Sequence, residues 1–271
     1  MTFIIATSGI DLSVASIVAL AGTVMGLAFQ EAQAPIAVAA CAAILAGALA
    51  GAFNGGIIGF LGVPPLVVTL ATMALFRGIA MGFSKGAPIG GFPETFTWIS
   101  QGDLFAISIG GSPAYIPAPI VALLLVTIVG GLLMRRSWIG RFTEHVGENE
   151  TAARFAAIDV RWLTFGIYTA CGALCGVAAL FHTALYATAK ADTAQGMELD
   201  VIACVVVGGT RISGGRASVS GTLLGLLIIG ILRYGLDMAG MKSQYVIVFV
   251  GALLIVTAVF NEWIGARGER R

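Results

Sequence analysis

A glycine-rich segment and a few thiols and imidazoles are the parts of this sequence whose residue types could do chemistry. The segment Gly209–Arg216 looks like the phosphate-binding pattern G-x-x-x-x-G-K-[ST]. Gly215 stands where that pattern needs the Lys that reaches the β- and γ-phosphates, and no ordinary α/β context surrounds the segment. Nucleotide binding is therefore rejected, and the segment is predicted to be a flexible turn between helices.

The thiols and imidazoles form no recognisable centre. The four cysteines all lie in apolar stretches: Cys41, Cys171, Cys175 and Cys204. They are expected to be buried as small apolar side chains, since no C-x-x-C motif is present. Two isolated histidines, His145 and His182, provide neither a nucleophile with its base nor an H-E-x-x-H motif. No catalytic residue and no metal site are predicted, and an intramembrane enzyme is not favoured.

The composition places the chain in a lipid bilayer. Of its 271 residues, 58% are hydrophobic and 11% are charged, whereas soluble domains are about 45–50% apolar and about 25% charged. A soluble domain and a disordered chain are both excluded, because each needs far more charge. With 15 Lys and Arg against 14 Asp and Glu, the net charge gives no reason to expect a nucleic-acid partner.

Long runs without charge mark the predicted crossings. A helix needs about 20 apolar residues to cross a hydrocarbon core about 30 Å thick, and the alternation typical of membrane β-strands is missing. The fold is therefore predicted to be an all-α polytopic membrane protein of about eight transmembrane segments, some of them short or broken. These segments are 12–29, 36–60, 66–84, 116–135, 162–186, 199–210, 220–236 and 244–263.

The distribution of Lys and Arg predicts the orientation. Five arginines fall in the loop 135–161: Arg135, Arg136, Arg141, Arg154 and Arg161. This loop and the C-terminus, which carries Arg267, Arg270 and Arg271, are predicted to be cytoplasmic. The loops 85–115 and 187–200 hold more acids than lysines and are predicted to be external. Because the loop 135–161 and the C-terminus both lie inside, an even number of crossings must separate them. The segments 162–186, 220–236 and 244–263 make three, so the short segment 199–210 must count as the fourth.

Two pairs of similar motifs indicate an internal repeat. Gly9-Ile-Asp-Leu-Ser-Val reappears as Gly196-Met-Glu-Leu-Asp-Val, and Gly47-x-Leu-x-Gly reappears as Gly221-x-Leu-x-Gly. The predicted orientation makes the copies inverted, as in many transporters. A single domain over residues 1–271 is predicted, made of repeat one (1–84), an odd span (116–135), a cytoplasmic loop (135–161) and repeat two (162–263).

The first copy has fewer residues before its motif than the second. A full helix precedes Gly196, whereas eight residues precede Gly9. The expectation is therefore that an opening helix is missing, either by truncation or by the choice of an internal Met as the start.

Glycines recur every four residues in the predicted segment 36–60. Gly47, Gly51, Gly55 and Gly59 form a strip down one helix face. Small residues at this spacing let helix backbones approach closely in lipid, so helix packing is the favoured interpretation. A glycine-lined path for a solute is the alternative.

The basic loop contains a helix start. Asn149 is a good N-cap, Glu150 puts an acid in the first turn, and Ala152, Ala153 and Arg154 favour helix. The sequence therefore predicts a short amphipathic helix on the cytoplasmic face.

Four stretches together make the chain similar to a known family. They are Met1–Ser13, Gly62–Met73 with Arg77-Gly78, the pattern Gly147-x-Asn-x-x-Ala-Ala-Arg154, and Glu198–Thr210 with Ser213–Arg216. The chain resembles the ribose-type sugar permeases of bacterial ABC importers, the branch that includes autoinducer-2 permeases. The resemblance implies that Gly147, Asn149, Ala152, Ala153 and Arg154 belong to a coupling loop that docks on an ATPase subunit. Ala157 stands where the family commonly has Gly.

The resemblance also implies partners and a location. The chain would be one half of a dimeric channel in the bacterial inner membrane, with a second permease subunit, identical or different. It would work with a cytoplasmic ABC ATPase subunit and a periplasmic sugar-binding protein. No cofactor is expected in this chain, because the partner subunit hydrolyses the ATP.

Polar residues inside the predicted spans could line a solute path. Hydroxyl and amide groups suit a sugar, and the candidates are Asn54, Thr69, Thr72, Met73 and Arg77. Bonds to neighbouring helices, or for Arg77 pairing and snorkelling, are the alternative. A secondary transporter driven by an ion gradient is the alternative function. It predicts paired acids at mid-membrane, and the motif acids Asp11, Glu198 and Asp200 lie near span ends instead.

Overall fold

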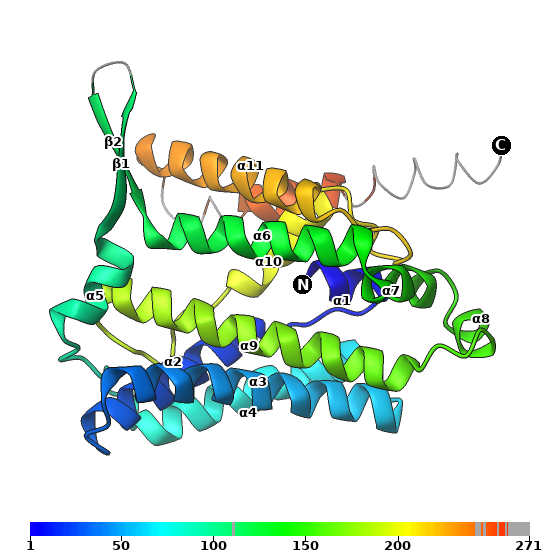
Figure 1. The fold of residues 1–271 in the computed structure, drawn as a ribbon, viewed down its shortest axis with the longest axis horizontal. Coiled ribbons are helices and arrows are strands. Elements are labelled where there is room, and N and C mark those ends of the chain that lie inside the picture. The colour runs from blue at the N-terminus through cyan, green and yellow to red at the C-terminus, as the bar shows by residue number, and fades with distance from the viewer. Residues whose placement is uncertain (110–111, 242–244, 246–247, 254, 258, 260–271) are drawn as a thin grey trace. The chain divides into compact units, whose positions relative to one another are not determined.

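The computed structural model of the chain describes residues 1–109, 112–241, 245, 248–253, 255–257 and 259. These residues form helices and one short hairpin, which confirms the predicted all-α membrane fold (Figure 1). The helices are α1 (Thr2–Ala6), α2 (Val14–Gln30), α3 (Ile36–Leu61), α4 (Pro65–Ser84), α5 (Glu94–Gln101), α6 (Ala118–Arg136), α7 (Trp138–Glu148), α8 (Glu150–Phe155), α9 (Val160–Tyr186), α10 (Met197–Val207) and α11 (Val219–Met238). The strands are β1 (Asp103–Ile109) and β2 (Ser112–Pro117).

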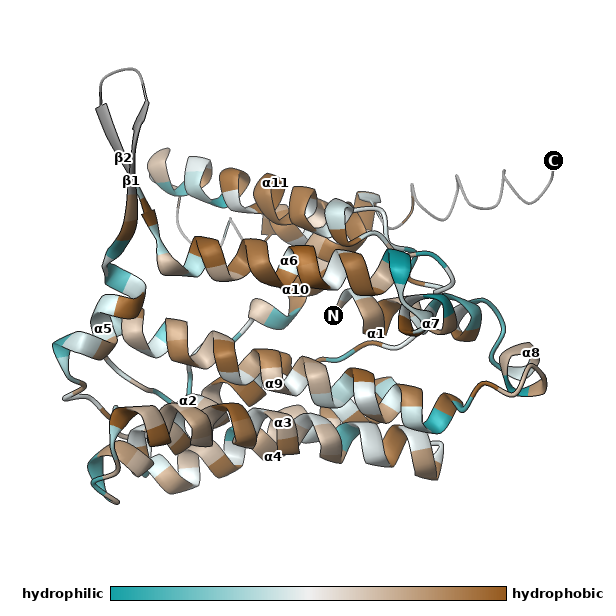
Figure 2. Cartoon of the chain, viewed as in Figure 1, coloured by the Kyte–Doolittle hydropathy of each residue, from teal (hydrophilic) through white to brown (hydrophobic). Residues whose placement is uncertain are grey.

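Five of the described helices are long and apolar enough to cross a membrane: α3, α4, α6, α9 and α11. Figure 2 shows hydrophobic residues along the whole length of α6 and α11. Each of the five begins and ends within two residues of its predicted segment. The helix α10 is short, with 11 residues, as its charge-free run predicts, and α2, with 17 residues, is also shorter than the five candidate spans. The last predicted segment, 244–263, is described only in part, and the arginines beyond it lie outside the described residues.

Proline and left-handed backbone set the ends of α3 and α4. Pro35 and Pro64 precede the two helices, where a missing N–H costs no intrahelical hydrogen bond. Gly62, with φ of +69°, ends α3, and Lys85, with φ of +53°, ends α4.

The chain forms two compact units that interleave along the sequence. Unit 1 comprises residues 1–11, 127–163 and 196–271, and unit 2 comprises residues 12–126 and 164–195. Within unit 2, α2 packs against α3 and α4. Within unit 1, α10 packs against α11, and α1 packs against α7. The predicted single domain with two inverted repeats stays a prediction.

The glycine strip of α3 is a helix-packing seam in unit 2. A Cβ on Gly51 would overlap the carbonyl oxygen of Tyr168 and lie 3.0 Å from the Cα of Gly172 on α9. A Cβ on Gly47 would similarly lie 2.9 Å from the amide nitrogen of Gly176. These backbones therefore touch only because no side chain separates them, which is the packing that the four-residue spacing predicts.

The equivalent glycines of the second motif pack on a different neighbour. In unit 1, a Cβ on Gly225 of α11 would lie 3.0 Å from the amide nitrogen of Gly208, which follows α10. A Cβ on Gly221 would overlap the carbonyl oxygen of Gly208. The two similar motifs thus both make close backbone contacts, one with α9 and the other with the end of α10.

Three elements were not predicted from the sequence. The helix α5 and the antiparallel pair β1–β2 lie in what was expected to be an external loop, 85–115. Ser100 of α5 donates a hydrogen bond to the carbonyl of Phe181, and Ile89 pairs with Ala189 as an isolated bridge. The third element, α7, lies in the cytoplasmic loop, where only one helix was expected. The predicted loops therefore contain folded structure that packs on the spans.

Candidate functional site

The predicted coupling loop folds as two helices joined at Asn149. The backbone N–H of Asn149 donates to the carbonyl of His145 and closes α7, and its Oδ1 accepts from the N–H of Ala152 at 2.9 Å and opens α8. The predicted N-cap is confirmed. One residue without helical backbone thus satisfies both helix ends and fixes the angle between them.

The charged side chains of α8 pair with each other. Nη2 of Arg154 lies 2.6 Å from Oε1 of Glu150, one helical turn earlier, and both side chains are about half exposed. An exposed pair at this spacing contributes about 0.3–0.5 kcal/mol. Its clearer effect is to hold Arg154 along the outer surface of the helix.

The two central alanines of the motif have opposite environments. Ala153 is 3% exposed and packs in an apolar cluster with Val146 and Val160. Ala152, one position earlier, is exposed. Ala153 therefore packs inside its own unit, whereas Ala152 is accessible. That both residues belong to a coupling loop stays a prediction.

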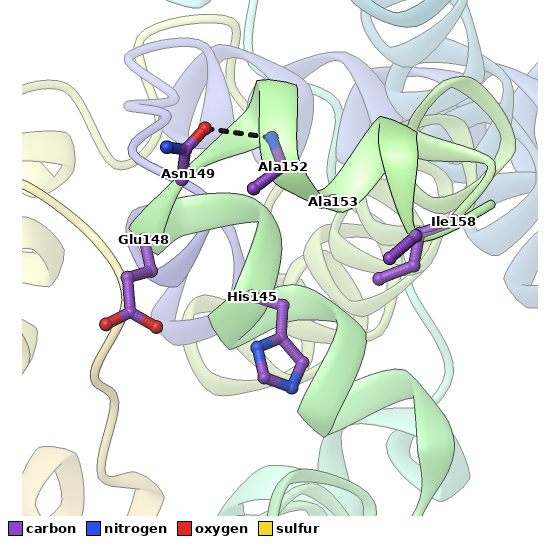
Figure 3. Close-up of a pocket in the computed structure, with 7 residues that line it drawn as sticks. His145, Glu148, Asn149, Ala152, Ala153 and Ile158 are labelled. Carbon is purple, nitrogen blue, oxygen red and sulfur yellow. Dashed lines mark hydrogen bonds between the residues drawn. The ribbon is translucent and has the colours of Figure 1, made fainter.

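A pocket lies beside the junction of the two helices (Figure 3). Its lining residues come from both helices and from the turn that follows α8: His145, Glu148, Asn149, Ala152, Ala153, Ala156 and Ile158. Three predicted coupling residues, Asn149, Ala152 and Ala153, line it, whereas Gly147 and Arg154 do not. His145 and Glu148 were not predicted, and only the helix α7, which the sequence analysis missed, brings them to the pocket.

Phe155 is a second feature that sequence reasoning missed. Its side chain is 87% exposed at the end of α8. Exposed apolar side chains on the long helices are explained by lipid, but α8 lies outside the five candidate spans. A phenylalanine next to Arg154 in a basic loop was the available signal.

The turn after α8 requires left-handed backbone at Ala157. Its φ is +60°, and the N–H groups of Ala157 and Ile158 donate to the carbonyls of Arg154 and Ala153. An alanine in this conformation is strained, whereas glycine adopts it freely. The difference from the glycine common in the resembling family is therefore a local strain.

Ala157→Gly should raise the free energy of unfolding of this loop by about 0.5–1 kcal/mol, because it removes that strain. Limited proteolysis of the detergent-solubilised protein measures local opening of the loop. The matched control is Ala156→Gly, since Ala156 has φ of −79° and gains nothing from glycine. Equal protection of both variants would contradict the assignment of strain to Ala157.

The predicted solute-path residues all lie in unit 2 and are buried or half-buried. The amide of Asn54 on α3 donates to Oγ of Ser13 at 2.8 Å, and Thr72 on α4 donates to the carbonyl of Thr69 at 3.3 Å. Oδ1 of Asn54 has no hydrogen-bond partner among the described residues. Met73 is half-buried on α4. Their role in a solute path stays a prediction, because Asn54 and Thr72 also bond other protein atoms, as the alternative interpretation expects.

Arg77 is engaged by the segment that follows α9. Its Nη1 donates to the carbonyls of Ala191 and Thr193 at 2.7 and 2.8 Å. These hydrogen bonds are the structural pairing that was the alternative to a place in a solute path. They link α4 to the segment that follows α9.

A charged pair links α10 and α11 in unit 1. Nη2 of Arg233 lies 2.5 Å from Oδ1 of Asp200, with side chains 37% and 16% exposed. From the sequence alone, Arg233 lies near one end of the predicted segment 220–236 and is expected to snorkel to the membrane surface. The structure pairs it instead with Asp200 of the repeated motif. Among the described residues, no group of three or more His, Cys, Asp or Glu side chains is placed to hold a metal ion.

The chain is similar to known transport permeases. Residues 1–258 match the model of a family described as the permease component of branched-chain amino acid transport systems. The ribose import permease protein RbsC of Escherichia coli K12 is 37% identical over 261 residues, which cover 96% of this chain and 78% of that protein. The autoinducer 2 import system permease protein LsrD of Yersinia pseudotuberculosis (strain YPIII) is 34% identical over 287 residues, covering 100% of this chain and 83% of that protein. No solved structure matches the chain.

Proposed function

The chain belongs to the family of permease components of branched-chain amino acid transport systems, and from that membership we propose that it is the transmembrane subunit of an ABC importer for a sugar or sugar-like solute. The likeness to the ribose import permease over nearly the whole chain carries this proposal. A second import permease among its relatives is named for autoinducer 2. Both names favour a small polyhydroxylated solute over an amino acid.

The proposed work of this chain is mechanical. ATP would be hydrolysed by a separate cytoplasmic subunit, and the α7–α8 loop would receive that subunit's movement. The capped, rigid join at Asn149 supports this role, because it lets two short helices move as one piece. A second permease subunit and a periplasmic binding protein would complete the importer. The loop 135–161 and the C-terminus would face the cytoplasm of a bacterial cell, with the chain in the inner membrane.

The test is solute uptake by the purified complex. The chain is purified in detergent with the ATPase subunit that accompanies it and is reconstituted in vesicles with the binding protein. We expect uptake of labelled ribose or autoinducer 2 that needs ATP and stops when the ATPase subunit is left out. Leucine, used at the same concentration, should not compete.

Other outcomes would contradict the proposal. Uptake that follows a proton or sodium gradient without ATP would favour a secondary transporter. ATP-dependent uptake of leucine, with no effect of either sugar-like solute, would keep the importer and reject the substrate class.

A further inference from the structure

Three segments that lie far apart in the sequence meet at the last turn of α7. They are the residues after α1, the end of α7 itself, and the loop between α10 and α11, and all belong to unit 1. The residues in contact are called here the Ser8 junction: Ala6, Ser8, Gly147, Ser213, Gly214 and Gly215. Two motifs of the sequence, the coupling pattern and Ser213-Gly-Gly-Arg, thus come together in space.

Hydrogen bonds from the first segment connect the other two. Oγ of Ser8 donates to the carbonyl of Ser213 at 2.7 Å and lies 3.1 Å from the carbonyl of Gly147. The N–H of Gly215 donates to the carbonyl of Ala6 at 3.1 Å. The segment after α1 therefore bridges the coupling loop and the loop that leaves α10.

The packing at the junction is backbone against backbone. A Cβ on Gly147 would overlap the carbonyl oxygen of Ala6 and lie 2.6 Å from the amide nitrogen of Gly215. A Cβ on Gly214 would lie 2.9 Å from both the carbonyl oxygen of Gly147 and the amide nitrogen of Ser8. A Cβ on Gly214 would also overlap Oγ of Ser8, so the serine side chain shares this close packing. Because the backbones of Ala6, Gly147 and Gly215 are in close contact, a displacement of Gly147 would displace its neighbours.

Glycines provide left-handed backbone near both ends of the loop 208–216. Gly214 and Gly215 have φ of +83° and +79°, and Gly209, at the other end of the same loop, has φ of +84°. Ser8 also has positive φ, +62°, which is strained for a residue with a side chain. Its hydroxyl bonds offset that strain and hold it in place. The loop thus has left-handed glycines near both ends, and Ser213 between them accepts the hydrogen bond from Ser8.

We propose that the Ser8 junction passes the movement of α7 and α8 to the loop 208–216 and so to α10. The proposal rests on the proposed function, in which the ATPase subunit moves the α7–α8 loop. Ser8 acts as a positioning residue, because its hydroxyl keeps the loop 208–216 in register with Gly147. A displacement of the coupling helices would then turn the loop about its glycines and shift the end of α10.

A thiol reporter in the loop tests this directly. Ile212 is 37% exposed and is replaced by Cys in a background whose four native cysteines are Ala. In the complex with the ATPase subunit, we expect trapping with ATP and vanadate to change the rate of maleimide labelling of Ile212→Cys at least threefold. Adding Ser8→Gly should abolish that change, while the amount of bound ATPase and its rate of ATP hydrolysis stay within twofold.

Glycine is the informative replacement, because it accepts φ of +62° and removes only the hydroxyl. The matched control is Gln33→Gly, at another non-glycine residue with positive φ, +50°, in unit 2. The control should leave the nucleotide response intact. Reverting the Ser8→Gly change to serine should bring back the nucleotide response of Ile212→Cys.

Two results would overturn the proposal. One is a nucleotide response of Ile212→Cys that survives Ser8→Gly or is missing in the parent complex. The other is loss of ATPase binding together with the response in Ser8→Gly, since a merely structural residue would lose both. Uptake by the parent vesicles is measured separately. ATP-driven uptake without the response rejects the junction and keeps the importer, whereas absence of ATP-driven uptake rejects the importer.

Discussion

Replacing Gly51 by Leu should remove most of the folded protein from the membrane fraction. A Cβ alone at this position would overlap the carbonyl oxygen of Tyr168, and the nearest further atoms are the backbone of Gly172. Overpacking of a closely packed core costs about 1–3 kcal/mol when side chains can adjust. Here two backbones would have to separate, so we expect a cost at or above the upper end of that range.

Gly56→Leu is the matched control for this prediction. Gly56 lies on the same helix, α3, and a Cβ there would meet nothing within 4 Å. Fluorescence-detected size-exclusion chromatography of the detergent extract measures the folded fraction of both variants after heating. Gly51→Leu should lose its monodisperse peak, and Gly56→Leu should keep it with a midpoint within a few degrees of the parent. Similar midpoints for the two variants would show that the α3–α9 seam is not needed for folding.

Ala153→Glu should disrupt the coupling loop itself. Its side chain would place a carboxylate among Val146, Val160 and their apolar neighbours. Burying an unpaired charge is costly enough that the loop would open instead. We expect loss of the bound ATPase subunit together with a large increase in protease sensitivity between residues 137 and 161.

Ala152→Glu is the comparison that separates folding from docking. Ala152 is exposed, so the same carboxylate there should leave the loop folded and protease-resistant. It should nevertheless reduce the amount of ATPase subunit that copurifies by at least tenfold, because the charge lies on the exposed surface of the α7–α8 loop, to which the proposed function assigns the partner. Undiminished binding of the ATPase subunit by a folded Ala152→Glu variant would contradict that assignment.

The positions of the spans could be predicted because lipid imposes a simple rule on the sequence. A segment without charge must be about 20 residues long to cross, and the ends of α3 and α4 are further marked by Pro35, Pro64 and Gly62. Asn149 could be recognised as a helix cap because capping depends on residues only a few positions apart. Such local signals are complete within the sequence.

What could not be predicted depends on partners distant in the chain. The strip of glycines indicated close packing, but α9 as the neighbour of α3 is a tertiary fact. Arg233 was expected to reach the membrane surface because its partner, Asp200, lies 33 residues earlier on a different helix. Which side of α8 is buried could not be predicted either. Its six residues are too few for a hydrophobic period to show that Ala153 is buried and Ala152 exposed.

The interleaving of the two units has a consequence for biosynthesis. The hydroxyls of Thr2 and Thr222 are hydrogen-bonded at 3.0 Å although 220 residues separate them, and Ser8 binds a carbonyl 205 residues later. The helix α1 is therefore made long before its partners emerge from the ribosome. During that interval α2, α3 and α4 can associate, because they neighbour one another in both sequence and space. Residues 2–8 can meet α7 earlier, but their bonds to Ser213 and Thr222 form only when α10 and α11 have been made. Completion of unit 1 is therefore a late step in the assembly of this protein.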